Sequence, residues 1–178
     1  MLKRLLRFAL ARDGLAALEF ALIAPLMIAM FYGAVELSSA MDCNSRVGRV
    51  AYSVADLVAQ STSVSSTDTS NIFNCAYAIL YPYDSTNAKI VVSSLVDNGK
   101  GATTVAWSDP TPNTTGRTKG STVSIPSGLI TSGSGASLIY AEITYTFTAP
   151  ITYFLGGPIT LKENFYAKPR RSTTVAHS

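Results

Sequence analysis

The side chains that commonly carry out chemistry in proteins are few in this sequence of 178 residues. His177 is its one histidine, so a Ser-His-Asp or Cys-His arrangement would depend on that residue alone. Two cysteines and one distant histidine do not have the spacing of a metal-ligand set, and no glycine-rich phosphate-binding motif occurs. We therefore expect no catalysis, no metal and no other cofactor. The acidic residues after Gln60 are isolated from one another in the sequence: Asp68, Asp84, Asp97, Asp109, Glu142 and Glu163.

Glu19 indicates a different kind of chemistry, because its carboxylate lies within an apolar segment. Residues 15–35 (LAALEFALIAPLMIAMFYGAV) are 21 residues with one charge. As a helix they would be about 31 Å long, close to the hydrocarbon thickness of a bilayer. An ionised carboxylate there costs at least about 2.5 kcal/mol, so Glu19 needs a partner. Pro25 removes one backbone hydrogen bond, which predicts either a kink or an ordinary tolerated membrane proline.

The composition supports a membrane segment and excludes a disordered chain. Hydrophobic residues make up 47% of the sequence and charged residues 14%, against the roughly 25% charged residues of an average soluble domain. The net charge of +3 comes entirely from residues 1–14, so it gives no basic face for nucleic acid. Positively charged segments beside a membrane span stay on the cytoplasmic side. We therefore expect the N-terminus to lie in the cytoplasm and the chain after the span to be exported. A secretory signal peptide cut near Ala40 is the competing interpretation.

The element that must position Glu19 and Pro25 is a helix of about 46 residues. Residues 15–36 are predicted to span the membrane, and residues 37–60 to continue as an amphipathic helix outside it. Asp42 and Arg46 lie one turn apart with favourable order. The apolar positions that recur at three- and four-residue steps, and that we expect on the buried side, are Leu37, Met41, Val47, Val50 or Ala51, Val54, and Leu57 or Val58.

The rest of the chain predicts a small α+β domain over residues 61–168, followed by a flexible tail over 169–178. A short helix is expected from about Thr69 to Tyr81, where Pro82 ends it. Alternating apolar residues and turn signals predict strands over 89–96, 103–107, 122–125, 137–148 and 160–167. The fold class is therefore α+β: a long N-terminal helix, a short second helix and a small antiparallel sheet.

Cys43 and Cys75 are both expected on the exported side, where disulfides persist. A bridge between them would attach the short helix to the long one. It would close a loop of about 30 residues, which is worth roughly 3–4 kcal/mol in the chain-entropy model. The sequence favours this disulfide, with two separate buried thiols as the alternative.

The spacing around Gly14 carries a family resemblance. A basic leader ends in Gly14, the apolar run begins at Leu15, and Glu19-Phe20 follows. This spacing resembles the N-terminus of type IV prepilin-like proteins. Residues 12–40 (RDGLAALEFALIAPLMIAMFYGAVELSSA) resemble the TadE/TadG-like family of Tad (tight adherence) pilus-assembly proteins. Residues 54–60 (VADLVAQ) and 166–172 (YAKPRRS) are also similar to that family.

The resemblance implies processing by a prepilin peptidase, which would cut between Gly14 and Leu15. The new ammonium at Leu15 can pair with Glu19 of the same chain or of a neighbouring subunit. Glu19, Phe20 and Pro25 are then the expected subunit-packing residues. Alternatively, Glu19 reaches the cytoplasmic interface of an uncut anchor. Leu15 departs from the Phe or Met common in ordinary type IV pilins, and the major Tad pilin is far shorter than this chain.

The resemblance therefore implies a minor pilin or pseudopilin with a pilin-like fold, and the absence of a catalytic motif agrees with a non-enzymatic role. It would reside in the bacterial inner membrane with its C-terminal domain in the periplasm, or be incorporated in a surface pilus. Its expected partners are membrane lipid, the prepilin peptidase, other minor pilins, the major pilin and the inner-membrane assembly platform. The alternatives are an uncleaved envelope-anchored scaffold of the same machine and a membrane-tethered module that binds a surface or glycan.

Overall fold

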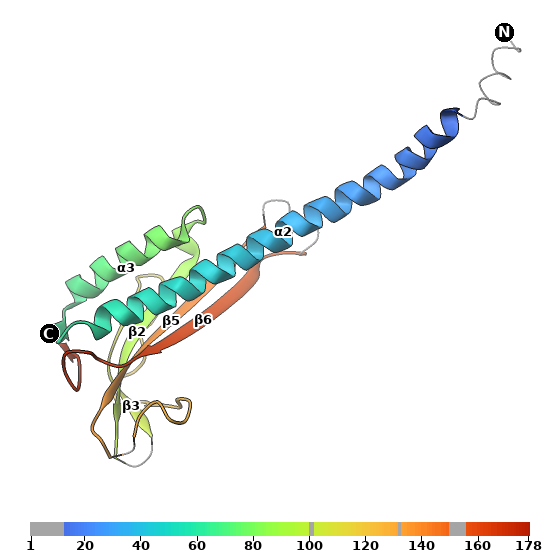
Figure 1. The fold of residues 1–178 in the computed structure, drawn as a ribbon. Helices are drawn as coiled ribbons and strands as arrows, with labels where there is room; N and C mark the ends of the chain where they lie inside the picture. Colours follow the sequence, from blue (N-terminus) through green and yellow to red (C-terminus); the bar gives the residue numbers. More distant parts are fainter. Residues whose placement is uncertain (1–12, 100–101, 132, 150–155) are drawn as a thin grey trace, which may run out of the picture.

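The computed structural model describes residues 13–99, 102–131, 133–149 and 156–178. The leader cations Lys3, Arg4, Arg7 and Arg12 lie outside these residues. A long helix, a short helix and an antiparallel sheet make up the described part of the chain (Figure 1), so the predicted α+β class is confirmed.

Helix α2 (Asp13–Ala59) is a single helix of 47 residues that joins the predicted membrane segment to the predicted amphipathic segment. Its first half extends away from the rest of the molecule, whereas its second half lies along the sheet beside α3 (Figure 1). The apolar residues of the two halves therefore have different surroundings, although one uninterrupted helix carries both.

Helix α3 (Ser66–Leu80) begins three residues before the predicted position. Its N-cap is Ser65, which forms a capping box with Asp68. The Ser65 hydroxyl oxygen accepts from the Asp68 backbone N–H at 3.2 Å, and the Asp68 carboxylate accepts from the Ser65 backbone N–H at 2.9 Å. Several Ser and Thr residues lie just before this helix, all of them types that can cap a helix, and Ser65 is the one that does so. Strand β1 (Ser63–Val64) precedes α3 and the short helix η1 (Ser85–Asn87) follows it.

The main sheet has five strands in the order β4-β3-β2-β5-β6, with antiparallel neighbours throughout. Its central strand β2 pairs with β3 and β5, for example through Ile90 opposite Ile143. The five predicted strands are confirmed, with shifted ends. Their bounds are β2 (Ala88–Asp97), β3 (Thr103–Pro110), β4 (Thr122–Val123), β5 (Ser137–Phe147) and β6 (Ile159–Ala167).

The main core lies between one face of this sheet and the two helices. The second half of α2 supplies a run of fully buried small and branched residues, and α3 supplies Phe73, Ala76 and Leu80. Strands β2 and β5 supply the facing layer, including Ile90, Val92 and Ile143. The buried residues of α2 are Cys43, Val47, Val50, Ala51, Val54, Ala55, Val58 and Ala59.

The C-terminal segment is ordered into the domain, which corrects the expectation of a flexible tail over 169–178. Strand β7 (Ala176–His177) pairs in parallel with β1, placing His177 opposite Val64. Val175 is buried, and its carbonyl accepts a hydrogen bond from Nε1 of Trp107 at 2.8 Å. The backbone N–H of Arg170 donates to the carbonyl of Ala59 at 2.9 Å. These contacts join residues far apart in the sequence, so a two-residue strand gave no local signal.

Candidate functional site

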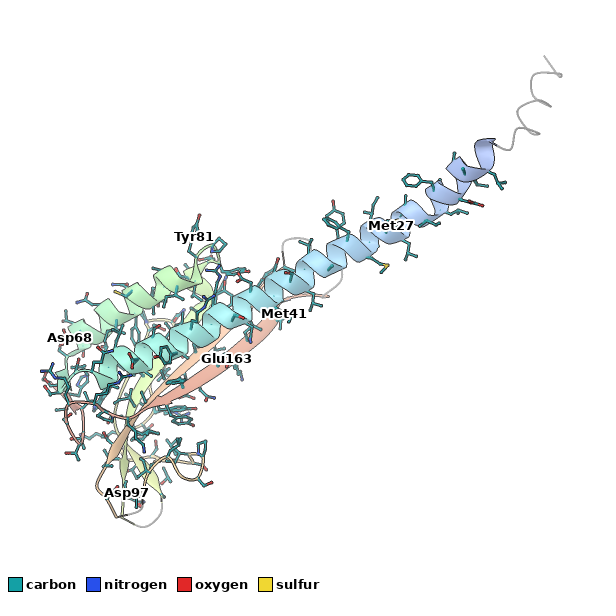
Figure 2. The ribbon with its side chains drawn as sticks, in the orientation of Figure 1. Met27, Met41, Asp68, Tyr81, Asp97 and Glu163 are labelled. Atoms are coloured by element: carbon teal, nitrogen blue, oxygen red, sulfur yellow. The ribbon has the colours of Figure 1, made fainter. Side chains whose placement is uncertain are left out.

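The exposed half of α2, residues 15–41, is the largest apolar surface on the described part of the chain. Figure 2 shows its side chains, Met27 among them, standing away from the domain. By length and composition, α2 is the one helix among the described residues that is long and apolar enough to cross a membrane. This indicates membrane anchoring. The large apolar side chains exposed here are Leu15, Leu18, Phe20, Leu22, Ile23, Leu26, Met27, Ile28, Met30, Phe31, Tyr32, Val35, Leu37 and Met41.

The residues predicted for processing and packing lie at the start of this surface. Gly14 lies within α2, one residue after its first position. Leu15, Glu19 and Phe20 are exposed. Leu15 and Glu19 are four residues apart, so they share one face of the helix, and a free amine at Leu15 could reach the Glu19 carboxylate. The structure therefore places the two predicted partners on neighbouring turns, and cleavage after Gly14 remains a prediction.

Pro25 lies inside α2, and the helix continues through it from Asp13 to Ala59. A proline has no backbone N–H, so the carbonyl one turn earlier receives no hydrogen bond from position 25. The side chain is exposed. Pro25 therefore weakens the helix locally without ending it, in the middle of the segment predicted to span the membrane.

A polar network marks the junction between the exposed and buried halves of α2. The Tyr83 hydroxyl lies 3.0 Å from Oδ2 of Asp42 and 2.9 Å from the carbonyl oxygen of Ser39. Nε of Arg46 donates to the same Asp42 oxygen at 2.8 Å, and Nη1 donates to the Tyr81 carbonyl at 2.5 Å. The predicted Asp42–Arg46 pair is present, and Tyr83 joins it from beyond the end of α3. The network thus attaches the end of α3 to α2 where the helix leaves the domain.

These contacts shift the ionisation of the junction residues. Hydrogen bonds from Arg46 and then Tyr83 hold the pKa of Asp42 below its usual value. Burial, followed by the hydrogen bond to Asp42, raises the pKa of Tyr83 to about 12. At neutral pH, Asp42 is therefore a carboxylate and Tyr83 a neutral donor, which is the combination that the hydrogen bond requires.

Glu36 is a carboxylate that the sequence analysis did not single out. Its neighbours Val35 and Leu37 are exposed, but Glu36 is only 1% exposed. It lies at the end of the predicted span, just before the junction network. Because the sequence analysis placed Glu36 on the membrane side of the junction, it gave no reason to expect the domain to cover this side chain.

The predicted disulfide between Cys43 and Cys75 is not formed, and both cysteines are free. Cys43 is buried, whereas Cys75 is exposed and lines a groove with Ser53 and other residues of α2. Between Cys43 and Ser53 the helix rises about 15 Å, while a disulfide needs its two Cα atoms within about 7 Å. The prediction was therefore wrong because α3 brings Cys75 to a different level of α2. Burial raises the pKa of the Cys43 thiol to about 11, which keeps it protonated.

The expected buried side of α2 also needs correction. Val47, Val50, Ala51, Val54 and Val58 are buried as predicted. Leu37 and Met41 are exposed, against the prediction, and Leu57, the alternative to Val58, is exposed as well. The periodicity therefore gave the helix correctly but combined residues from two of its faces.

His177 and Asp109 come together at the C-terminal segment, with Nε2 of His177 2.9 Å from Oδ2 of Asp109. The Thr69 hydroxyl lies 2.7 Å from that same oxygen. Both the hydroxyl and the imidazole therefore bind the carboxylate, whereas a catalytic triad places the imidazole between the other two groups. The Trp107 ring packs against His177 with centroids 5.2 Å apart. The arrangement fixes strand β7 to β3 and to α3.

Two other acidic residues hold the sheet and its loops. Glu142 forms a two-pronged ion pair with Arg117 at 2.6 and 2.7 Å, which attaches the loop after β3 to β5. Asp97 accepts backbone N–H groups from Gly99 at 3.1 Å and from Gly133 at 2.5 Å. Asp97 lies at the end of the domain far from the exposed half of α2 (Figure 2). The acids that looked isolated in sequence thus have structural partners.

Comparison with known families agrees with the geometry at the long helix. Residues 14–56 match the family of TadE-like proteins. The match confirms the resemblance, and it covers most of α2, from Gly14 through the exposed half into the buried half. The segment at 166–172 lies outside it. No curated protein and no solved structure matches the chain.

Proposed function

We propose that this chain is a non-enzymatic, membrane-anchored subunit of a Tad-type pilus assembly machine, of the minor pilin or pseudopilin kind. The observation that carries the proposal is the division of α2. One half exposes a continuous apolar surface with Glu19 near its start, and the other half is built into a separate polar-surfaced domain. The match of residues 14–56 to TadE-like proteins covers the same helix.

In this proposal the chain enters the inner membrane with its N-terminus in the cytoplasm and its domain in the periplasm. A prepilin peptidase cuts between Gly14 and Leu15 and removes the basic leader. The amine of Leu15 then neutralises Glu19, in its own chain or in a neighbour, which lowers the cost of placing the carboxylate in the bilayer. The exposed half of α2, with Phe20 and Pro25, packs against lipid and against the helices of other subunits.

The domain provides the partner-recognition surface in the same proposal. It would contact other minor pilins, the major pilin and the inner-membrane assembly platform. After these contacts form, the processed chain would be incorporated into the surface pilus. The junction network of Asp42, Arg46 and Tyr83 holds the domain at a defined place along α2, so the helix and the domain would move into an assembly as one unit.

The test is the intact mass and N-terminal sequence of the protein purified from its native membrane. A chain that begins at Leu15 is the expected result, and Gly14→Asp should block the processing because a larger side chain replaces the glycine beside the cut bond. Glu19→Gln is the companion variant: it should still be cut but should assemble poorly. A protein that keeps Met1 in the presence of the peptidase would contradict the processing and favour the uncleaved anchor.

A further inference from the structure

Asp97 differs from most other acids of the domain in the groups that contact it. Four acids of the described residues lie against a basic side chain: Asp42, Asp56, Asp109 and Glu142. Asp97 is only 9% exposed, yet no basic nitrogen of the described residues lies within 4 Å of its oxygens. A buried carboxylate is usually paired with a cation. The described part of the chain does not provide that cation for Asp97.

Asp97 lines a pocket of about 340 Å³ at the end of the sheet. Its row of the sheet continues through Thr103 on β3 to Val123 on β4, and both side chains are buried. Leu95, two residues before Asp97, belongs to a second core that is separate from the one under the helices. The pocket therefore lies on the sheet face opposite to α2 and α3. We call it the tip pocket; its lining includes Asp97, Thr103, Val123, Ile125, Pro126 and Ile130.

The two buried polar side chains of the tip pocket are available as hydrogen-bond acceptors. The Thr103 hydroxyl donates to the Val123 carbonyl at 2.6 Å, so its oxygen can only accept a further hydrogen bond. The two Asp97 oxygens each accept one backbone N–H, from Gly99 and from Gly133, and each can accept another. The site therefore favours a ligand that brings a positive charge and several N–H donors.

A primary ammonium group on an aliphatic chain fits the tip pocket. It is a compact charge with three rotatable donors. A guanidinium binds a carboxylate best through both oxygens at once, and here backbone N–H groups already contact both. The apolar residues that follow β4, Ile125, Pro126 and Ile130, would pack against the aliphatic stem, as apolar surfaces do around lysine.

The position of the tip pocket indicates where this ammonium group comes from. Asp97 lies at the end of the domain far from the exposed half of α2 (Figure 2). In the proposed membrane anchoring, the pocket therefore faces away from the bilayer, and an amine of a lipid headgroup cannot reach it. A protein that lies beyond the domain can.

We infer that the tip pocket binds a lysine side chain of another protein, with the ammonium group against Asp97 and Thr103. This inference deepens the proposed role of the domain in partner recognition and rests on that proposal for the source of the lysine. The chemistry of the pocket itself can be measured on the purified chain, whether or not its leader has been removed.

An NMR titration of the purified full chain in detergent tests the chemistry of the pocket. The probe is N-acetyl-lysine N-methylamide, and the backbone amide signals of Gly99 and Gly133 report its binding because both groups contact Asp97. Saturable shifts are expected. N-acetyl-norleucine N-methylamide has the same stem without the charge and should bind at least about tenfold more weakly. Equal binding of the two probes, or tighter binding of the corresponding arginine probe or of cadaverine, would overturn the inference.

Two variants locate the binding in the tip pocket. Asp97→Asn should weaken binding of the lysine probe at least about tenfold. Ser124 is exposed and lines the same pocket, so the longer side chain of Ser124→Lys should occupy it and weaken the probe about tenfold without disturbing the contacts of Asp97. Ser124→Gln is the matched neutral control and should bind the probe as the native protein does. Native affinity in both Asp97→Asn and Ser124→Lys would exclude this site.

Lys100 needs its own control, because it follows Asp97 by three residues and lies outside the described residues. Lys100→Ala should leave the affinity for the lysine probe within about twofold of the native value. Binding that appears only in Lys100→Ala would mean that the chain's own lysine fills the pocket, which would overturn the inference. A dimer of the purified chain that Asp97→Asn abolishes would also overturn it, because the partner would then be a second copy.

The yield of assembled pili tests the partner and separates this inference from the proposed function. Asp97→Asn and Ser124→Lys should lower the yield while the chain still begins at Leu15, and Ser124→Gln should not lower it. Normal yields with Asp97→Asn and Ser124→Lys would overturn the docking of a partner lysine. Glu19→Gln, measured beside them, then shows which proposal has failed: a low yield leaves the proposed function standing, and a normal yield contradicts that function as well.

Discussion

Both halves of α2 are rich in apolar residues, but these residues have opposite surroundings in the two halves. In residues 43–59 the valines and alanines are fully buried against the sheet and α3. In residues 15–41 leucines, isoleucines, methionines and phenylalanines are exposed. The helix itself is continuous, so secondary structure does not separate the halves. They differ in what lies against them.

This difference shows which apolar residues stabilise the fold of the isolated chain and which do not. A fully buried Val or Leu contributes about 1.5–3 kcal/mol relative to an exposed one, and the second half of α2 contributes this to the folding of its own domain. The side chains of the first half contribute nothing comparable to the isolated chain. Their burial is left for a bilayer or another subunit, which makes the first half the part of the molecule that depends on its surroundings.

The largest expected loss of unfolding free energy follows from placing a charge in the buried half of α2. Val54 is 0% exposed, so Val54→Asp should destabilise the domain by more than about 4 kcal/mol because it buries an unpaired charge. The same change in the exposed half, Leu37→Asp, should alter the unfolding free energy by less than about 0.5 kcal/mol. Denaturant unfolding of the full chain in detergent measures both. Similar losses for the two variants would break the comparison between the halves.

Truncating the residue that α3 packs into the core should have the next largest effect. Phe73 is 5% exposed and belongs to the main core. Phe73→Ala should therefore cost about 3–5 kcal/mol in the same unfolding measurement. Tyr81→Ala, at the exposed end of α3, is the control and should change the stability little. A small loss at Phe73 would mean that α3 does not help to hold the buried half.

The sequence predicted the elements well because their signals are local. Alternation over Ser137–Phe147 gave the central part of the sheet, and the apolar run gave α2. It did not predict which face of α2 the sheet would cover, because the helix has two apolar faces of similar spacing. Leu37 and Met41 were placed with Val47 for that reason, although both are exposed.

The remaining errors concern contacts between distant parts of the chain. The Cys43–Cys75 disulfide depended on how far α3 lies along α2, which no local pattern records. The order of the C-terminal segment depends on Trp107 and on strand β1, both far from Val175 in the sequence. Tyr83 is a similar case, since its role at the junction follows from where the chain emerges after α3.

A smaller loss of stability is expected at high pH, where Tyr83 at the junction between the two halves of α2 ionises. Burial and then the hydrogen bond to Asp42 raise the pKa of Tyr83 from 10.0 to about 12, so the folded state favours the neutral phenol. Its contribution to stability is complete below pH 10 and is lost as the pH rises to about 12. The difference in unfolding temperature between the native protein and Tyr83→Phe should shrink across that range. A difference that stays constant would exclude this linkage.

At low pH, the same network should lose stability as the pH falls, because Asp42 becomes protonated. Arg46, followed by Tyr83, lowers the pKa of Asp42 below 3.8, so the folded state favours the carboxylate. This contribution is present above pH 3.8 and is lost as the pH falls through the lowered value. Asp42→Asn should therefore remove part of the acid dependence of the unfolding temperature.

The smallest effect on stability is expected at Cys75, an exposed residue of α3. Cys75 is exposed, so it should react with a maleimide within minutes without a reductant. Cys43 is buried with a pKa raised to about 11 and should react only on unfolding. Cys75→Ser should abolish the rapid labelling and change the unfolding free energy by less than about 0.5 kcal/mol. If the untreated protein instead showed no reactive thiol and lost several degrees of stability on reduction, a Cys43–Cys75 disulfide would have formed. Cys75 would then have to lie beside Cys43 and not beside the groove that it lines with Ser53.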